Sequence, residues 1–312
     1  MNKAQKPDQE EGIESMKSKA WNEKFMQGVF FIAACASVLA VALICVFLFA
    51  KGVPAMKEIG FVKFITGEMW KPNNDIYGIL PMIVGSIYVT AGAIIVGVPI
   101  GILTSVFMAM YCPKKIYRPL KAATELLAGI PSVVYGFFGL VVLVPWVREL
   151  GRTWREMGLT KSSGNGSGIL TASILLGMMI LPTIIGVTES AIRSVPQQYY
   201  EGALALGATH ERSIFRVIMP AAKSGVIAGI VLGVGRAIGE TMAVIMVAGN
   251  QARMPAGLLK GVRTLTANIV IEMGYAAELH REALIATGVV LFVFILIINF
   301  SVALLNRRSG RE

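Results

Sequence analysis

The amino-acid sequence predicts an all-α membrane protein that crosses the bilayer about six times. Three observations lead to this fold class: charged residues make up only 15% of the chain, hydrophobic residues make up 55%, and the charges leave long gaps. A soluble domain carries about 25% charged residues. A spanning helix needs about 20 apolar residues to cross the hydrocarbon layer, and several of the gaps are longer than that.

Five gaps contain no charged residue, and a sixth contains only two. The charge-free gaps are Phe25–Ala50, Ile76–Pro113, Leu126–Val147, Gly168–Thr188 and Ala283–Leu305. The sixth gap, 225–249, is apolar apart from Arg236 and Glu240. The second gap is longer than one span requires, so we expect it to hold one tilted helix and an interfacial stretch.

These gaps define the expected organisation of the chain. We expect a flexible polar tail over 1–24, a first transmembrane helix over 25–50 and an external loop over 51–75. A core of five further transmembrane helices then occupies 76–305, and a short tail covers 306–312. The net charge of +10 comes from Lys and Arg in the connecting loops, so membrane lipid and not nucleic acid is the expected surrounding.

The distribution of basic residues predicts the orientation. Sixteen Lys and Arg fall on the side of the N-terminus and twelve on the other side. Because basic loops stay in the cytoplasm, both termini are expected there. The bias is small, so it favours this topology by a modest margin.

No pattern for catalysis or metal binding is present in the sequence. His210 and His280 are isolated, so no metal site is expected. The serine-hydrolase, zinc-protease and phosphate-loop motifs are all missing. If transport uses ATP, the nucleotide and its Mg²⁺ must bind a partner chain, and this chain needs no cofactor of its own.

The connection between the fourth and fifth expected spans has its own helical pattern. Residues 199–207 are rich in helix formers and end in glycine, a frequent helix stop. Thr209 is a plausible N-cap for a second helix, whose apolar residues recur at helical spacing before Pro220. We expect a short helix, a tight turn and a second helix at the membrane surface.

This connection resembles the cytoplasmic signature of ATP-binding-cassette (ABC) importer permeases. That signature runs Glu-Ala-Ala, three residues, Gly, nine residues, Ile, any residue, Leu, Pro. The chain departs from it by Gly202 for Ala, Val217 for Ile and Met219 for Leu, all small or apolar replacements. The residues expected to couple to an ATPase are Glu201, Gly202, Ala203, Leu204, Leu206, Gly207 and Pro220.

The resemblance implies a type I ABC importer permease of the MetI-like fold. It also implies that the 199–220 loop is a coupling helix that docks into a groove of the ATPase subunit. Small residues such as Ala203 allow close approach, and Leu204 and Leu206 can anchor in a groove. The competing interpretation is an amphipathic interfacial helix with no protein partner.

Further stretches resemble the permeases of phosphate importers in particular, and the PstC type more than the PstA type. They are Glu125–Leu140, Gly235–Val244, Trp70–Pro72 and Tyr77–Pro81. This resemblance implies phosphate as substrate, the bacterial inner membrane as location, and partners of three kinds. These are a second permease of the PstA type, an ATPase dimer of the PstB type and an external phosphate-binding protein of the PstS type.

Arg236 and Glu240 are expected to lie on the substrate path. Their spacing of four residues would place them on one helix face. A charge inside the bilayer costs about 2.5–3.5 kcal/mol on insertion scales, so it should face the bundle interior or a water-filled path. Guanidinium suits phosphate oxygens, and Glu240 would hold Arg236. The alternative is a structural ion pair that joins helices or the two permeases.

Two more acids, Glu125 and Glu189, are expected near the cytoplasmic ends of their spans. Interfacial placement accounts for both, and gating is a possible further role. Two other functions stay open at this point. One is a permease of the same class for molybdate, sulfate or an amino acid, and the other is a self-contained secondary transporter or channel.

Overall fold

The computed structural model describes residues 7–160 and 163–309, with side chains from 24–160 and 163–301. Contacts divide the chain into two units, which meet between Lys51 and Gly52. Five helices are long and apolar enough to cross a membrane, and a sharply bent helix pair gives a sixth. The all-α fold class and the number of spans therefore agree with the sequence expectation.

Helix α1 (Pro7–Ile59) supplies the first span and contains the whole of the first unit that is described. Its part from Lys24 to Ile59 has a mean hydropathy of 2.9, and no residue in its apolar window is buried. A helix that is apolar all round suits lipid. The helix begins at Pro7 and not at Phe25, because proline fits the first helical turn and helix-forming residues follow it. It ends at Gly60, whose φ of 94° breaks the helical path.

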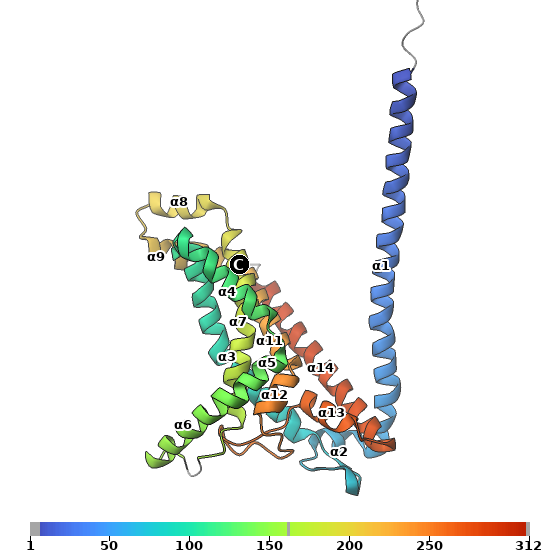
Figure 1. Cartoon of the computed structure of the whole chain (residues 1–312), viewed down its shortest axis with the longest axis vertical. Helices are drawn as coiled ribbons and strands as arrows, with labels where there is room; N and C mark the ends of the chain where they lie inside the picture. Colours follow the sequence, from blue (N-terminus) through green and yellow to red (C-terminus); the bar gives the residue numbers. More distant parts are fainter. Residues whose placement is uncertain (1–6, 161–162, 310–312) are drawn as a thin grey trace, which may run out of the picture. The chain divides into compact units, whose positions relative to one another are not determined.

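Three helices form the centre of the second unit: α3 (Leu80–Val106), α7 (Ile169–Arg193) and α11 (Lys223–Gly239) (Figure 1). Helix α7 lies between the other two and contacts both. Glycines allow this close approach: a Cβ at Gly97 would lie 2.8 Å from the carbonyl oxygen of Gly177. Ile180 and Ile184 of α7 are fully buried in this centre.

The third span is displaced from its expected position. Its membrane-spanning part is Ser132–Glu156, formed by α5 (Ser132–Phe138), the π-helical turn η3 (Gly139–Leu143) and α6 (Val144–Glu156). The preceding residues 114–129 form a separate helix, α4. Pro131 separates the two, because proline cannot continue a helix and forces the residue before it into an extended conformation; Ile130 has ψ 127°.

The fifth span is bent at its start and broken at its end. The elements α9 (His210–Ser213), η4 (Ile214–Ile218) and α10 (Met219–Ala221) lead into α11 through a bend of 70°. Helix α11 then stops at Gly239, and a short helix α12 (Met242–Val247) follows. The apolar gap 225–249 is therefore not one continuous helix.

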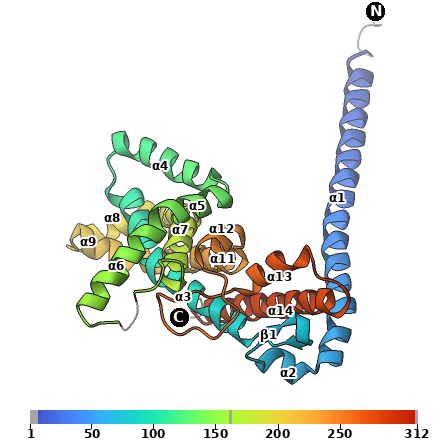
Figure 2. The same ribbon diagram turned by 60° about the horizontal axis from the view of Figure 1, so that its bottom comes forward.

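The end of the second unit opposite α8 (Gln197–Ala205) and α9 contains the short elements (Figures 1 and 2). The segment expected as an external loop is mostly ordered structure: the end of α1, α2 (Phe61–Thr66), β1 (Trp70–Lys71), η1 (Pro72–Asn74) and β2 (Ile76–Tyr77). The strands pair antiparallel, with Trp70 opposite Tyr77. Helices α13 (Leu265–Met273) and α14 (Glu278–Ser309) complete this end. The π-helical turn η2 (Phe107–Tyr111) and α4 (Lys114–Gly129) lie toward the α8 end.

Candidate coupling site and substrate path

Helix α8 presents an exposed surface at one tip of the second unit. None of its residues is buried. Leu206, directly after the helix, is 91% exposed, and Leu204 is 40% exposed. Glu201 accepts a hydrogen bond from Gln197 Nε2 at 2.7 Å. Exposed leucines on a short helix outside the spans are suited to bind a partner groove.

The turn after α8 forms as the sequence predicts. Gly207 has a φ of +83°, a conformation that glycine adopts without the steric cost of a Cβ. Thr209 Oγ1 then accepts from the backbone N–H of Arg212 and caps α9. Pro220 lies in the first turn of α10, where its missing N–H is not needed, and the chain bends after it.

His210 attaches this coupling loop to the end of the second span. Its Nδ1 is hydrogen-bonded to Tyr200 Oη of α8 at 2.6 Å. The Tyr111 ring of η2 packs edge-on against the imidazole, with centroids 4.8 Å apart. The histidine described above as isolated is therefore a junction between the loop and the membrane-spanning helices.

Glu189 is a second junction near the same end, in the last turns of α7. It is 1% exposed and accepts hydrogen bonds from Tyr117 Oη at 2.7 Å and Lys121 Nζ at 2.9 Å, both from α4. Arg193 Nε donates to it at 2.9 Å. The hydrogen bond to Glu189 raises the pKa of Lys121 and also that of Tyr117. The sequence did not predict this burial, whose cost the three donors offset, and the expected gating role of Glu189 stays a prediction.

Arg236 lies in the last turn of α11. Its Nη1 donates to Thr183 Oγ1 of α7 at 3.4 Å. Among the described side chains, no carboxylate forms an ion pair with it. The predicted Arg236–Glu240 pair is not formed in this chain.

Glu240 has a different position from the one expected. The helix ends one residue earlier, and Glu240 is extended with ψ 131°. Its Oε1 accepts from the backbone N–H of Ala243 at 3.2 Å and so caps α12. Its carbonyl oxygen accepts from Thr266 Oγ1 at 3.1 Å. The spacing rule of four residues fails because the two residues do not share a helix.

Comparison with known proteins decides the family. A family model described as "Binding-protein-dependent transport system inner membrane component" matches residues 97–311. The chain belongs to this family.

Curated relatives agree with this assignment. The chain is 37% identical over 287 residues to a probable ABC transporter permease protein, YqgH, of Bacillus subtilis, covering 88% of this chain and 90% of the relative. It is 36% identical over 265 residues to the phosphate transport system permease protein PstC of Mesorhizobium japonicum, covering 82% and 81%.

Solved structures of ABC transporters share the fold. A crystal structure of the inward-facing MetNI methionine ABC transporter has a TM-score of 0.56 at 20% identity, covering 77% of this permease and 99% of that chain. A bacterial ABC transporter for the import of alginate also gives 0.56, at 15% identity, covering 93% and 99%. The expected MetI-like fold and the expected family are thus confirmed.

Glu125, the other acid expected near the end of a span, differs from Glu189 in its burial. It is exposed on α4 and lines a groove of about 650 Å³ together with Leu126, Gly129 and Pro131. It takes no part in the hydrogen bonds around Glu189. Its gating role stays a prediction.

Sequence reasoning missed a buried charged cluster at the opposite end of the permease. Glu272 of α13 is 5% exposed. Trp70 Nε1 donates to its Oε2 at 2.7 Å, His280 Nε2 lies 2.9 Å from the same oxygen, and Arg263 Nη1 lies 2.5 Å from Oε1. The signal available in the sequence was an acid within the mostly apolar run 265–273.

Proposed function

We propose that this chain is a transmembrane subunit of an ABC importer for inorganic phosphate. The observation that carries the proposal is Arg236. A cation inside a spanning helix needs an anion or a water-filled path, and its described partner is the neutral hydroxyl of Thr183. A guanidinium with unoccupied donors can bind phosphate oxygens in a fork geometry. Relatives named as phosphate permeases support this substrate.

The revised position of Glu240 changes the mechanism. Its carboxylate caps α12, so it does not neutralise Arg236 and leaves the guanidinium available to substrate. Passing phosphate would exchange its hydration for Arg236 and the neighbouring hydroxyl. A single half-buried cation binds the anion weakly enough to release it on the other side.

Energy for the cycle comes from partner chains in this proposal. Leu204 and Leu206 dock into an ATPase dimer of the PstB type, which binds ATP and Mg²⁺ and hydrolyses the nucleotide. Movement of α8 passes to the spans through His210 and Tyr111, which are in contact. A second permease of the PstA type completes the path, and an external binding protein of the PstS type delivers phosphate. Both termini of this chain lie in the cytoplasm.

Reconstitution in proteoliposomes tests the proposal. The importer is assembled from this chain and its three partner types, and ATP hydrolysis is measured with the binding protein loaded in turn with each oxyanion. Phosphate-loaded protein should stimulate hydrolysis and uptake. Equal stimulation with molybdate or sulfate would instead assign a general oxyanion permease, and uptake without any ATPase subunit would indicate a secondary transporter.

A further inference from the structure

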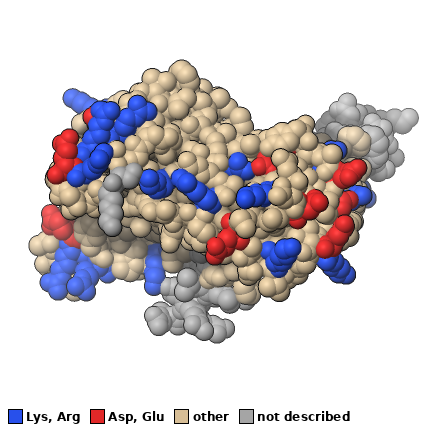
Figure 3. Space-filling model, turned by 90° about the horizontal axis from the view of Figure 1, so that it is seen from below, with Lys and Arg blue, Asp and Glu red and all other residues tan. Residues whose placement is uncertain are grey.

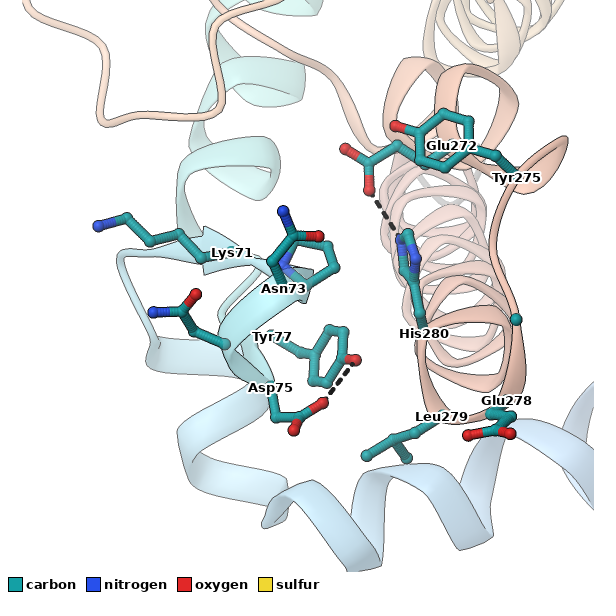
Figure 4. A pocket seen from close by; sticks show the side chains of 12 residues that line it. Lys71, Asn73, Asp75, Tyr77, Glu272, Tyr275, Glu278, Leu279 and His280 are labelled. Atoms are coloured by element: carbon teal, nitrogen blue, oxygen red, sulfur yellow. Dashed lines mark hydrogen bonds and ion pairs between the residues drawn. The ribbon is translucent and has the colours of Figure 1, made fainter.

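A cavity of about 710 Å³ opens at the end of the permease opposite the coupling loop (Figure 4). One wall is the β1–β2 hairpin with η1, and the other is the turn between α13 and α14. The two walls are almost 200 residues apart in sequence. The first wall belongs to the segment around Trp70 that resembles phosphate-importer permeases. Neither the proposed ATPase coupling nor the proposed substrate path at Arg236 involves this segment.

The cavity wall is held by the Glu272 cluster. Trp70, Arg263 and His280 come from three separate segments, and all three hold the same carboxylate. Both oxygens of Glu272 are occupied, so its charge is compensated within the wall. A wall fixed by buried hydrogen bonds gives a preformed binding surface.

Two other acids face the cavity from opposite sides. Asp75 and Glu278 are both exposed, and Asp75 Oδ1 accepts a 3.3 Å hydrogen bond from Tyr77 Oη. This hydrogen bond raises the pKa of Tyr77 in addition to the larger effect of burial. The basic lining residue, Lys71, directs its ammonium away from both acids (Figure 4).

Aromatic rings lie among the residues that line the cavity. The Tyr77 and His280 rings are stacked with centroids 6.1 Å apart, and Tyr275 lies 6.0 Å from His280. Tyr275 is 68% exposed, whereas Tyr77 is 3% exposed and the His280 side chain 14%, so Tyr275 is the ring of these three that a partner group can reach. Carboxylates bind guanidinium and ammonium groups through ion pairs, and an exposed ring adds a cation–π contact. The lining therefore has the chemistry of a receptor for a basic side chain.

The charge of the cavity argues against a substrate site. A phosphate ion would be repelled by Asp75 and Glu278, which both line the cavity. Acidic and basic side chains are interspersed on the face at this end of the molecule (Figure 3). A protein partner that approaches this end can satisfy the same carboxylates with Arg or Lys. The family is binding-protein-dependent, so its partner at the face away from the ATPase is the binding protein.

We propose that this cavity receives a basic side chain of the external binding protein and thereby orients that protein on the permease. The inference rests on the proposed function for the identity of the partner. Complementary charges mainly increase the rate and specificity of association. Neutralising the cavity should thus weaken docking and leave the transport steps that follow unchanged.

The test is the Asp75→Asn, Glu278→Gln double variant in the reconstituted importer. Both acids have positive φ, 54° and 45°, and Asn tolerates that conformation. Stimulated ATPase activity is titrated with phosphate-loaded binding protein. In the variant, we expect the half-saturating concentration of binding protein to rise about tenfold, with the maximal ATPase rate unchanged. Docking to the wild type should weaken as salt concentration rises, and docking to the variant should depend much less on salt.

The matched control is the Glu149→Gln, Glu156→Gln double variant. It removes two exposed acids from α6 at the same end of the molecule and should leave the titration unchanged. An unchanged half-saturating concentration in the cavity variant, or an equal rise in the control, would overturn the docking site. Failure of the wild-type importer to respond to phosphate-loaded protein would instead refute the proposed function, so the two failures are distinguishable.

Discussion

Arg236 lies in the last turn of α11, whereas Glu240 lies beyond the end of that helix and caps α12. They are four positions apart in sequence, but their side chains contact different groups. Arg236 contacts Thr183 of α7, and Glu240 holds the backbone of Ala243. The two charges should therefore have separable effects on the protein, one on substrate passage and the other on local structure.

Replacing Arg236 by Gln should reduce phosphate uptake by about tenfold to a hundredfold. A charge-assisted hydrogen bond contributes about 1.5–3 kcal/mol, and the variant loses the charge while keeping a polar side chain that can donate hydrogen bonds. Arg236→Lys should keep part of the uptake, since it preserves the charge without the fork. Uptake of labelled phosphate into proteoliposomes measures the effect, with assembly checked by copurification of the partners. Normal uptake in the Gln variant would remove Arg236 from the path.

Glu240→Ala should destabilise the start of α12 and leave Arg236 in place on the proposed substrate path. Loss of a cap costs about 1 kcal/mol. Backbone amides of α12, that of Ala243 first, should exchange hydrogen faster in mass spectrometry, while exchange in α7 stays as in wild type. If Glu240→Ala abolished uptake with α12 exchange unchanged, its carboxylate would act on substrate and not on structure.

Leu206→Asp should uncouple the permease from its ATPase. A charge in an apolar groove is costly, whereas the exposed site itself tolerates a polar residue, with stability changing by no more than about 0.5 kcal/mol. The stimulated ATPase rate should fall at least tenfold with an unchanged melting temperature. Leu159→Asp is the control, since Leu159 is 69% exposed and lies beyond α6, away from the coupling loop. Equal loss in both variants would contradict a docking role for Leu206.

Glu189→Gln should lower the thermal stability of the detergent-solubilised protein. Lys121 and Arg193 lose their shared counterion, and loss of a charged hydrogen bond costs about 1.5–3 kcal/mol. The loss of stability should lie near the lower end of this range, because both cations are partly exposed. Glu125→Gln, at an exposed position on α4, should leave the melting temperature unchanged. Equal melting temperatures for all three proteins would show that the Glu189 network does not stabilise the fold.

Short stretches of sequence predicted the parts of the fold that depend on one residue or on one run of residues. Gly207 and Thr209 mark the coupling turn because a positive φ and a helix cap are properties of single residues. The long apolar gaps locate most spans because the lipid environment requires them. The same gaps could not reveal the break at Gly239, since an apolar run fits one helix or two.

The remaining features depend on distant contacts. Thr266 stabilises the break by donating to the Glu240 carbonyl. Trp70 and Glu272 are 202 positions apart and still share a hydrogen bond, so no window of sequence contains both. The burial of Glu189 could not be predicted because its donors on α4 lie about 70 residues earlier in the chain.

The bend of 70° at Ala222 determines the direction in which the coupling loop can move the fifth span. A push along the axis of the first arm, from His210 to Ala221, acts mostly across the axis of α11. Under the proposed function, we expect a push from an ATPase subunit to tilt α11 against α7 more than to slide it along its own axis. Arg236, in the last turn of α11, would then shift sideways where the substrate passes.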